Sequence, residues 1–170
     1  TLLNVGAGLL EPSAGQVRVF GQPLSGINTR AGYMFQTEAL MPWRTARANV
    51  MAGLEFRGVP DAGAQSDQWL KRVGLGGFGD RYPHQLSGGM RKRTSLAQTL
   101  VLDPDIVLFD EPDSGLDPVR TALLCELIQE IHEENGGAYT VITHDIMSAR
   151  RVAEYIAVLW RGRIVESGPA

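Results

Sequence analysis

Short apolar runs alternate with longer amphipathic stretches along most of the chain. The apolar runs predict strands over residues 16–20, 32–35, 105–109, 140–143 and 156–160. The stretches with helical periodicity predict helices over residues 46–56, 65–73, 88–102, 119–134 and 146–153. This alternation predicts an α/β fold with a mostly parallel sheet at its centre.

Three segments refine that prediction. Residues 106–109 are apolar without alternation, as in a parallel strand that is buried on both faces. In the 119–134 helix, five apolar side chains recur at helical spacing and should face the sheet: Leu123, Leu124, Leu127, Ile128 and Ile131. Residues 159–165 predict a hairpin that turns at Arg161 and Gly162.

The chain divides into a core and a smaller helical part. Residues 45–82 carry helical patterns and loops but no convincing strand, so we expect a helical subdomain there. Residues 1–44 and 83–170 would then form the α/β core. The chain opens inside an apolar, helix-like pattern and ends in a turn, so we expect a fragment of a longer protein.

Composition limits the classes of protein. Of 170 residues, 44% are hydrophobic and 21% charged, which fits a globular domain and excludes intrinsic disorder. The net charge of −3 argues against a nucleic-acid partner, which calls for a basic surface. No apolar run reaches the length of a membrane span, and the one cysteine, Cys125, fits a reducing cytosol.

Polar residues follow two of the predicted strands. Asp110 and Glu111 come after residues 106–109, and His144 and Asp145 come after residues 140–143. Ligands of parallel sheets bind outside the carboxyl ends of the strands, so these groups should converge on one crevice. Adjacent carboxylates suit a division of labour in which one holds Mg²⁺ and the other handles a proton. The alternative is that Asp110 and Asp145 only cap the helices that follow.

A second candidate site precedes the helix predicted from residue 88. Ser87 is a good N-cap, and Gly88 and Gly89 leave backbone N–H groups bare at the positive end of the helix dipole. Such a site suits a phosphate. The alternative is a plain capped helix with a flexible start.

The order of these motifs resembles the nucleotide-binding domain of ABC transporters over essentially the whole chain. Phe35-Gln36 matches the Q-loop, residues 86–90 (LSGGM) match the signature motif, and residues 106–111 match the Walker B strand. Residues 114–117 (SGLD) match the D-loop, and residues 143–145 match the H-loop. The resemblance implies a P-loop NTPase-type core whose N-terminal strands and Gly-rich phosphate loop would lie upstream of Thr1.

The resemblance also implies ATP and Mg²⁺ as ligands and a role for each matched residue. Asp110 would hold Mg²⁺, and Glu111 would accept the proton of the attacking water. His144 would contact the γ-phosphate, and Gln36 would contact the metal and the water. Thr1 would contact a phosphate. Ser87, Gly88 and Gly89 would act on the ATP of a second subunit, and Asp117 would lie at the same interface.

Partners follow from the same resemblance. They are a second nucleotide-binding subunit, a transmembrane permease and a substrate-binding protein, at the cytoplasmic face of the membrane. Met41, Pro42 and Trp43 are apolar in an expected loop, which favours a docking surface for a partner helix over the alternative that they fill the core. Without the phosphate loop, this chain alone is expected to hydrolyse no ATP.

The transported substrate stays open between two classes. Residues 35–45 and 89–98 look like nitrate, sulfonate or taurine importers, whereas residues 110–121 look like lipid transporters of the Mce/Mla type. The D-loop region favours the lipid class. An ABC ATPase of DNA maintenance would need a long coiled coil between the Q-loop and the signature, and a non-catalytic module would not need Glu111 and His144. The run Arg91-Lys92-Arg93 is interpreted as a solvated helix face.

Overall fold

The centre of the molecule is a three-stranded parallel sheet. The computed structural model describes all residues from Thr1 to Ala170. The strand order is β3 (Ala31–Met34), β4 (Ile106–Asp110) and β5 (Ala138–Ile142), with β4 in the middle. The α/β prediction is confirmed, and the strand boundaries agree with it within two residues.

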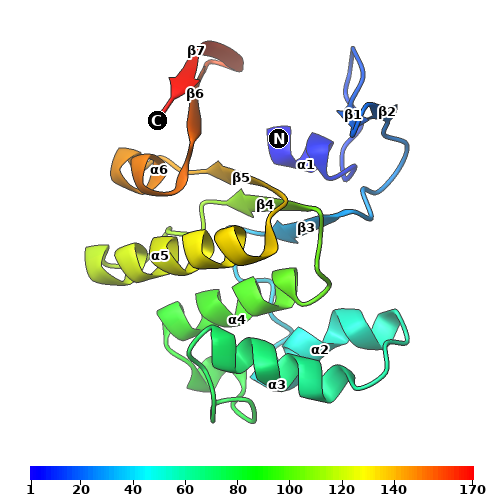
Figure 1. Cartoon of the computed structure of the whole chain (residues 1–170), viewed down its shortest axis with the longest axis vertical. Helices are drawn as coiled ribbons and strands as arrows, with labels where there is room; N and C mark the ends of the chain where they lie inside the picture. The colour runs from blue at the N-terminus through cyan, green and yellow to red at the C-terminus, as the bar shows by residue number, and fades with distance from the viewer.

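Helices cover both faces of this sheet (Figure 1). Along β4, Val107 and Phe109 face α4 (Gly88–Leu100) and α5 (Pro118–Asn135), whereas Ile106 and Leu108 face α1 (Leu2–Gly6). Helix α4 comes close to β3 at Gly32, where an added Cβ would lie 2.8 Å from the carbonyl oxygen of Thr99. The absence of alternation in residues 106–109 therefore did indicate a strand buried on both faces.

The segment between β3 and α4 is helical, as the sequence predicts. It contains α2 (Ala46–Phe56), α3 (Ala62–Arg72) and the short 3₁₀ helix η1 (Pro83–Gln85), and it has no strand. Figure 1 shows α2 and α3 on the side of α4 that faces away from the sheet. The main apolar core runs from Val50 and Leu70 through Leu96 to Phe109 and Ile128, so both parts share one core. The proposed boundaries at residues 44 and 83 stay a prediction.

Two hairpins complete the fold. Strands β1 (Arg18–Val19) and β2 (Gln22–Pro23) form a minimal pair, shorter than the strand predicted over 16–20. Helix α6 (Ile146–Val152) leads into β6 (Tyr155–Trp160) and β7 (Arg163–Pro169). Their turn has positive φ at Arg161 and Gly162, as the predicted hairpin requires. No helix combines the length and the apolar character that crossing a bilayer demands.

A buried asparagine fixes the loop that precedes α2. Asn49 is fully buried, and its side-chain oxygen accepts from the N–H of Met41 at 2.7 Å. Its amide group donates to the carbonyls of Met41, Arg44 and Thr45 at 3.0–3.1 Å. The loop that carries Trp43 is therefore closed on itself, although the Trp43 side chain is 73% exposed.

Candidate functional site

The sheet register brings the carboxyl ends of the three strands to one level. Met34, Phe109 and Val141 are aligned across β3, β4 and β5. Gln36, Glu111 and Thr143 each follow two residues later, and His144 comes next after Thr143. The sequence separates these residues widely, and the parallel register places them at the same edge.

Three of the predicted site residues meet at Glu111. The Gln36 side-chain amide donates to Glu111 Oε2 at 2.9 Å, and His144 Nδ1 lies 3.4 Å from the same oxygen. The His144 side chain is 75% exposed and that of Glu111 27% exposed, so the cluster opens to solvent. Glu111 has a φ of 46°, a left-handed conformation that is uncommon for residues with a side chain and typical of functional sites.

Asp110 is tied to the other face of the sheet through Tyr33. The Tyr33 hydroxyl lies 3.3 Å from Asp110 Oδ2 and 2.9 Å from Asn4 Oδ1 in α1. Burial, together with the charge and hydrogen bond of Asp110, raises the pKa of Tyr33 to about 12. Thr1 is the exposed N-cap residue of α1 and lies one helical turn before Asn4. Asp110 ends β4 and caps no helix, contrary to the alternative that it serves only as a cap.

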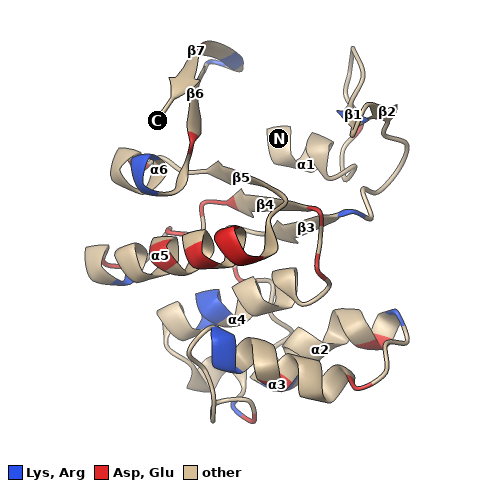
Figure 2. Ribbon diagram, in the orientation of Figure 1, with Lys and Arg blue, Asp and Glu red and all other residues tan.

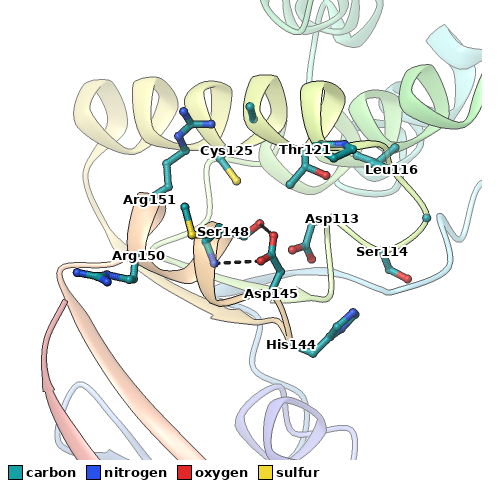
Figure 3. A pocket seen from close by; sticks show the side chains of 14 residues that line it. Asp113, Ser114, Leu116, Thr121, Cys125, His144, Asp145, Ser148, Arg150 and Arg151 are labelled. Carbon is teal, nitrogen blue, oxygen red and sulfur yellow. Dashed lines mark hydrogen bonds between the residues drawn. The ribbon is translucent and has the colours of Figure 1, made fainter.

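Asp145, in contrast, has the capping role. Its carboxylate accepts from the Met147 N–H at 3.0 Å and from the Ser148 hydroxyl at 2.8 Å (Figure 3). The Ser148 hydroxyl, followed by the Met147 N–H, lowers the pKa of Asp145. Asp145 therefore serves as the N-cap of α6.

Asp113 and Thr143 join the D-loop region to the H-loop. The Thr143 hydroxyl donates to Asp113 Oδ2 at 2.7 Å and accepts from the Asp145 N–H at 3.0 Å. Asp113 is 8% exposed, and its Oδ1 has no hydrogen-bond partner. A cavity of about 790 Å³ opens beside it between residues 113–116, α5 and α6, with His144 among its lining residues (Figure 3).

The glycine-rich segment, residues 87–89, lies on a part of the surface away from the Glu111 cluster. Ser87 caps α4, and its hydroxyl accepts from the Met90 N–H at 3.3 Å. Ser87 and Gly89 line a cavity of about 440 Å³ with Leu116, residues 72–74 and residues of α5 from Arg120 to Glu130, and none of Gln36, Asp110, Glu111 or His144 lines it. The structure therefore does not bring the signature residues to the Glu111 cluster of their own chain.

Asp117 also has a local role. It caps α5 by accepting from the Arg120 N–H at 3.0 Å, and it pairs with the Arg120 guanidinium at 3.2 Å. Both side chains are about half exposed.

The oxygen atoms near Glu111 fit a Mg²⁺ ion that is shared with a ligand. Asp110 and the amide of Gln36 supply hard oxygen donors, while no group of three or more His, Cys, Asp or Glu side chains could hold a metal alone. Mg²⁺ is commonly held by one or two carboxylates together with substrate phosphates. The donor set is therefore the type that suits Mg²⁺ bound with a nucleotide.

Sequence reasoning missed Tyr33 and Asp113 and was wrong about Lys92. Arg91, Lys92 and Arg93 form the basic stretch on α4 in Figure 2, yet Lys92 is 3% exposed. Its ammonium donates to the Gln36 carbonyl oxygen at 2.6 Å. Arg91 and Arg93 are half-buried and donate to the carbonyls of Leu86 and Val73. The signal available in the sequence was that Lys92 is one of only two lysines and stands beside the apolar stripe of α4.

Comparisons with known proteins agree with this geometry. The profile of the ABC transporter family matches residues 1–114. A taurine import ATP-binding protein of Pseudomonas putida is 39% identical over 170 residues, covering 98% of this chain and 65% of that protein. A methionine import ATP-binding protein of Rhodococcus jostii is 39% identical over 179 residues, covering 99% of this chain and 53% of that protein. The chain thus spans about half to two thirds of the length of these relatives.

A solved structure supports the same assignment. It is a dimeric, post-hydrolysis state of the ATP-binding cassette MJ0796 bound to ADP and Pi. The TM-score is 0.87 at 29% sequence identity, and the match covers 99% of this chain and 78% of that one. With two thirds of the chain matched by the family profile and nearly all of it matched in three dimensions, the chain belongs to the ABC transporter family of ATP-binding domains.

Proposed function

We propose that this chain is part of the ATP-binding subunit of an ABC importer and couples ATP hydrolysis to transport across a membrane. The observation that carries the proposal is the cluster at the carboxyl ends of the parallel strands, where Gln36 and His144 both reach Glu111 Oε2. Membership of the ABC transporter family and the importer names of its relatives support the same activity.

The chemistry assigned to the cluster is hydrolysis of the γ-phosphate. Phosphoryl transfer is catalysed mainly by positioning and by charge stabilisation. Glu111 takes up the proton of the attacking water on its carboxylate, and the Gln36 amide at 2.9 Å orients that carboxylate. His144, mostly exposed beside Glu111, contacts the γ-phosphate.

Asp110 and Gln36 are the residues that would hold Mg²⁺. The bound ion neutralises charge on the phosphate oxygens. The Tyr33 hydroxyl orients the Asp110 carboxylate at one oxygen and leaves the other without a side-chain hydrogen bond. Thr1, at the N-terminus of α1, contacts a phosphate.

A second copy of the protein completes each site. The signature residues Ser87, Gly88 and Gly89 lie away from their own Glu111 cluster, which supports their action on ATP held by the other subunit. Asp117 lies beside them through Arg120 and Leu116, and we place it at the same interface. The dimeric state of the related cassette supports this arrangement.

The remaining partners are a transmembrane permease and a substrate-binding protein, with this subunit at the cytoplasmic face of the membrane. The exposed Trp43, together with Met41 and Pro42, supplies an apolar surface for a permease helix. The names of the relatives favour taurine- or methionine-type solutes as cargo. Residues 110–121 are the feature that favours a lipid, and stimulation of ATP turnover by each candidate in the permease complex distinguishes the two classes.

The test of hydrolysis is Glu111→Gln in the full-length protein. The amide keeps the size of the side chain but cannot accept the proton, so turnover of Mg-ATP should fall at least about a hundredfold while nucleotide binding is kept. Phosphate release and equilibrium binding of a fluorescent nucleotide measure the two properties. Glu133→Gln, at an exposed position on α5, is the matched control. Unchanged turnover in Glu111→Gln would contradict the proposed role.

A further inference from the structure

Lys92 is a buried positive charge that the proposed mechanism does not use. It lies in α4, five residues after the N-cap Ser87, and is 3% exposed. Lysine is almost never fully buried without a partner, because removing its ammonium from water is costly. Its contact is the backbone carbonyl of Gln36, 2.6 Å from Nζ, and it forms no ion pair within 4.0 Å.

The surroundings of Lys92 keep the ammonium near the site. The carboxylates of Glu38, Asp113 and Glu111 favour its charged form, although burial dominates and lowers the pKa of Lys92. All three belong to the loops that follow β3 and β4 at the same edge of the sheet. The ammonium is therefore buried within reach of the charges on these two loops, whereas the His144 side chain is mostly exposed.

The contacts form one chain from the signature helix to Glu111. Lys92 holds the main chain of Gln36, and the side chain of Gln36 holds Glu111 Oε2 at 2.9 Å. Ser87 and Lys92 belong to the same rigid helix, so a shift of the signature segment moves Lys92 with it. The carbonyl that accepts from Lys92 belongs to Gln36, whose side chain orients Glu111.

We propose that Lys92 is a positioning residue that couples the seating of the Ser87–Gly89 segment to the placement of Gln36 against Glu111. The inference rests on the proposed ATPase function. It gives the signature segment two roles, one on the nucleotide of the second subunit and one on the catalytic cluster of its own chain. The only other lysine, Lys71, is exposed in α3 and forms no ion pair, so the chain contains its own control.

The kinetic test uses the full-length protein. Lys92→Met should lower kcat about tenfold and leave KM for ATP within about twofold, because the hydrogen bond to a charged donor is lost while the nucleotide contacts remain. Lys92→Arg should restore most of kcat because it keeps a charged donor, and Lys71→Met should match the wild type. A kcat in Lys92→Met equal to that of Lys71→Met, or no rescue by Lys92→Arg, would overturn the inference.

A double-mutant cycle separates coupling from general destabilisation. In a Gln36→Ala background, Lys92→Met should lower kcat less than about twofold, since Lys92 acts through the Gln36 side chain. An undiminished tenfold loss in that background would show that Lys92 acts by another route and would refute the proposal.

Acylation with an amine-reactive reagent tests the link without activity. In the wild type, Lys71 should be modified rapidly and Lys92 at least about a hundredfold more slowly, both without nucleotide and, in Glu111→Gln, with ATP. Equal reactivity of the two lysines would refute the link. If the wild type hydrolyses no ATP while Lys92 stays protected, the proposed function fails and the structural link stands.

Discussion

The Tyr33 hydroxyl lies between two acceptors, Asn4 Oδ1 and Asp110 Oδ2, and connects α1 to the end of β4. The native state favours its protonated form, since the pKa of Tyr33 is raised from 10.0 to about 12. Between pH 10 and about 12, the folded protein therefore keeps the Tyr33 hydroxyl proton, which the unfolded chain has already lost. The stability that Tyr33 contributes is present below pH 10 and is lost as the pH rises through about 12.

Tyr33→Phe should therefore reveal a pH-dependent difference. The free energy of unfolding of the wild type should exceed that of Tyr33→Phe at pH 8, and the difference should shrink towards pH 11. Urea unfolding at both pH values measures it, and taking the difference removes the contributions of other groups. Tyr82→Phe, whose hydroxyl makes no hydrogen bond, gives the baseline. A difference that is equal at both pH values would contradict the raised pKa.

Thr143→Val tests the link between Asp113 and the H-loop. The change keeps the shape of the side chain but leaves the buried Asp113 carboxylate without its one donor. An unsatisfied buried acceptor costs about 1–3 kcal/mol, so we expect a loss of that order in the free energy of unfolding. Thr140→Val, at an exposed position in β5 three residues earlier, should change it by less than about 0.5 kcal/mol. Equal effects of the two variants would rule out the link.

At this scale the sequence singled out three residues that the structure brings together at Glu111, and it missed the residues that support them. Gln36, Glu111 and His144 stand in motifs that can be recognised by their order and spacing along the chain. Lys92 looked like part of a solvated basic face because charge patterning describes a helix in isolation. Its burial depends on the Gln36 segment, which lies far away in sequence and packs over it only in the folded chain.

Among the elements, α5 shows how far periodicity determines packing. Leu124, Ile128 and Ile131 are buried against the sheet as predicted, and Leu127 is partly buried. Leu123 is 60% exposed and lines the cavity beside the signature residues, so its predicted packing on the sheet is wrong. The apolar stripe is narrower than the pattern of leucines, because Leu123 lies at the margin of the face that meets α4.

Alanine substitutions at Ile128 and Leu123 should lower the free energy of unfolding by different amounts, because the two side chains lie on different faces of α5. Ile128→Ala should lower the free energy of unfolding by about 2–5 kcal/mol, since it leaves a cavity in the main core. Leu123→Ala should lower it by less than about 1 kcal/mol because most of that side chain is already in water. Chemical denaturation measures both, and a larger loss in Leu123→Ala would contradict the assigned faces.

The start of α3 could not be predicted from the sequence pattern. Helix α3 begins at Ala62, three residues before the predicted start. Asp61, its N-cap residue, has a φ of 56° and makes no side-chain capping bond. The usual capping signal is therefore weak here, and packing of α3 against α2 determines where the helix begins. Helices α4 and α5, in contrast, have the N-cap residues Ser87 and Asp117, which make capping bonds, and their starts were predicted within one residue.

For the whole molecule, alternation of strands and helices was sufficient to predict a parallel sheet, because parallel neighbours need crossover helices. The sequence could not show how the signature segment lies relative to the catalytic cluster, since that depends on how α4 packs on the sheet. Within one chain the signature segment and the catalytic cluster are separated. A site that combines them would need two copies of the chain, and the association of two copies can be measured.

We expect the full-length Glu111→Gln protein to dimerise when ATP is added. The unhydrolysed nucleotide should bridge the two subunits, whereas Ser87→Arg in the same background should prevent the dimer by placing a bulky side chain where backbone N–H groups approach the phosphate. Light scattering with and without ATP measures the mass. Ser13→Arg, in an exposed loop, controls for added charge. A Glu111→Gln protein that stays monomeric at saturating ATP would refute the two-subunit site.

The four hydrogen bonds of Asn49 have a consequence for how partners associate. Exposed aromatic side chains on mobile loops lose conformational entropy when they bind, which reduces affinity. The backbone on either side of Trp43 is already fixed by a buried amide, so little main-chain ordering remains for a partner to impose. Recognition at this loop should be close to rigid docking, with fast association and similar loop conformations in the free and bound states.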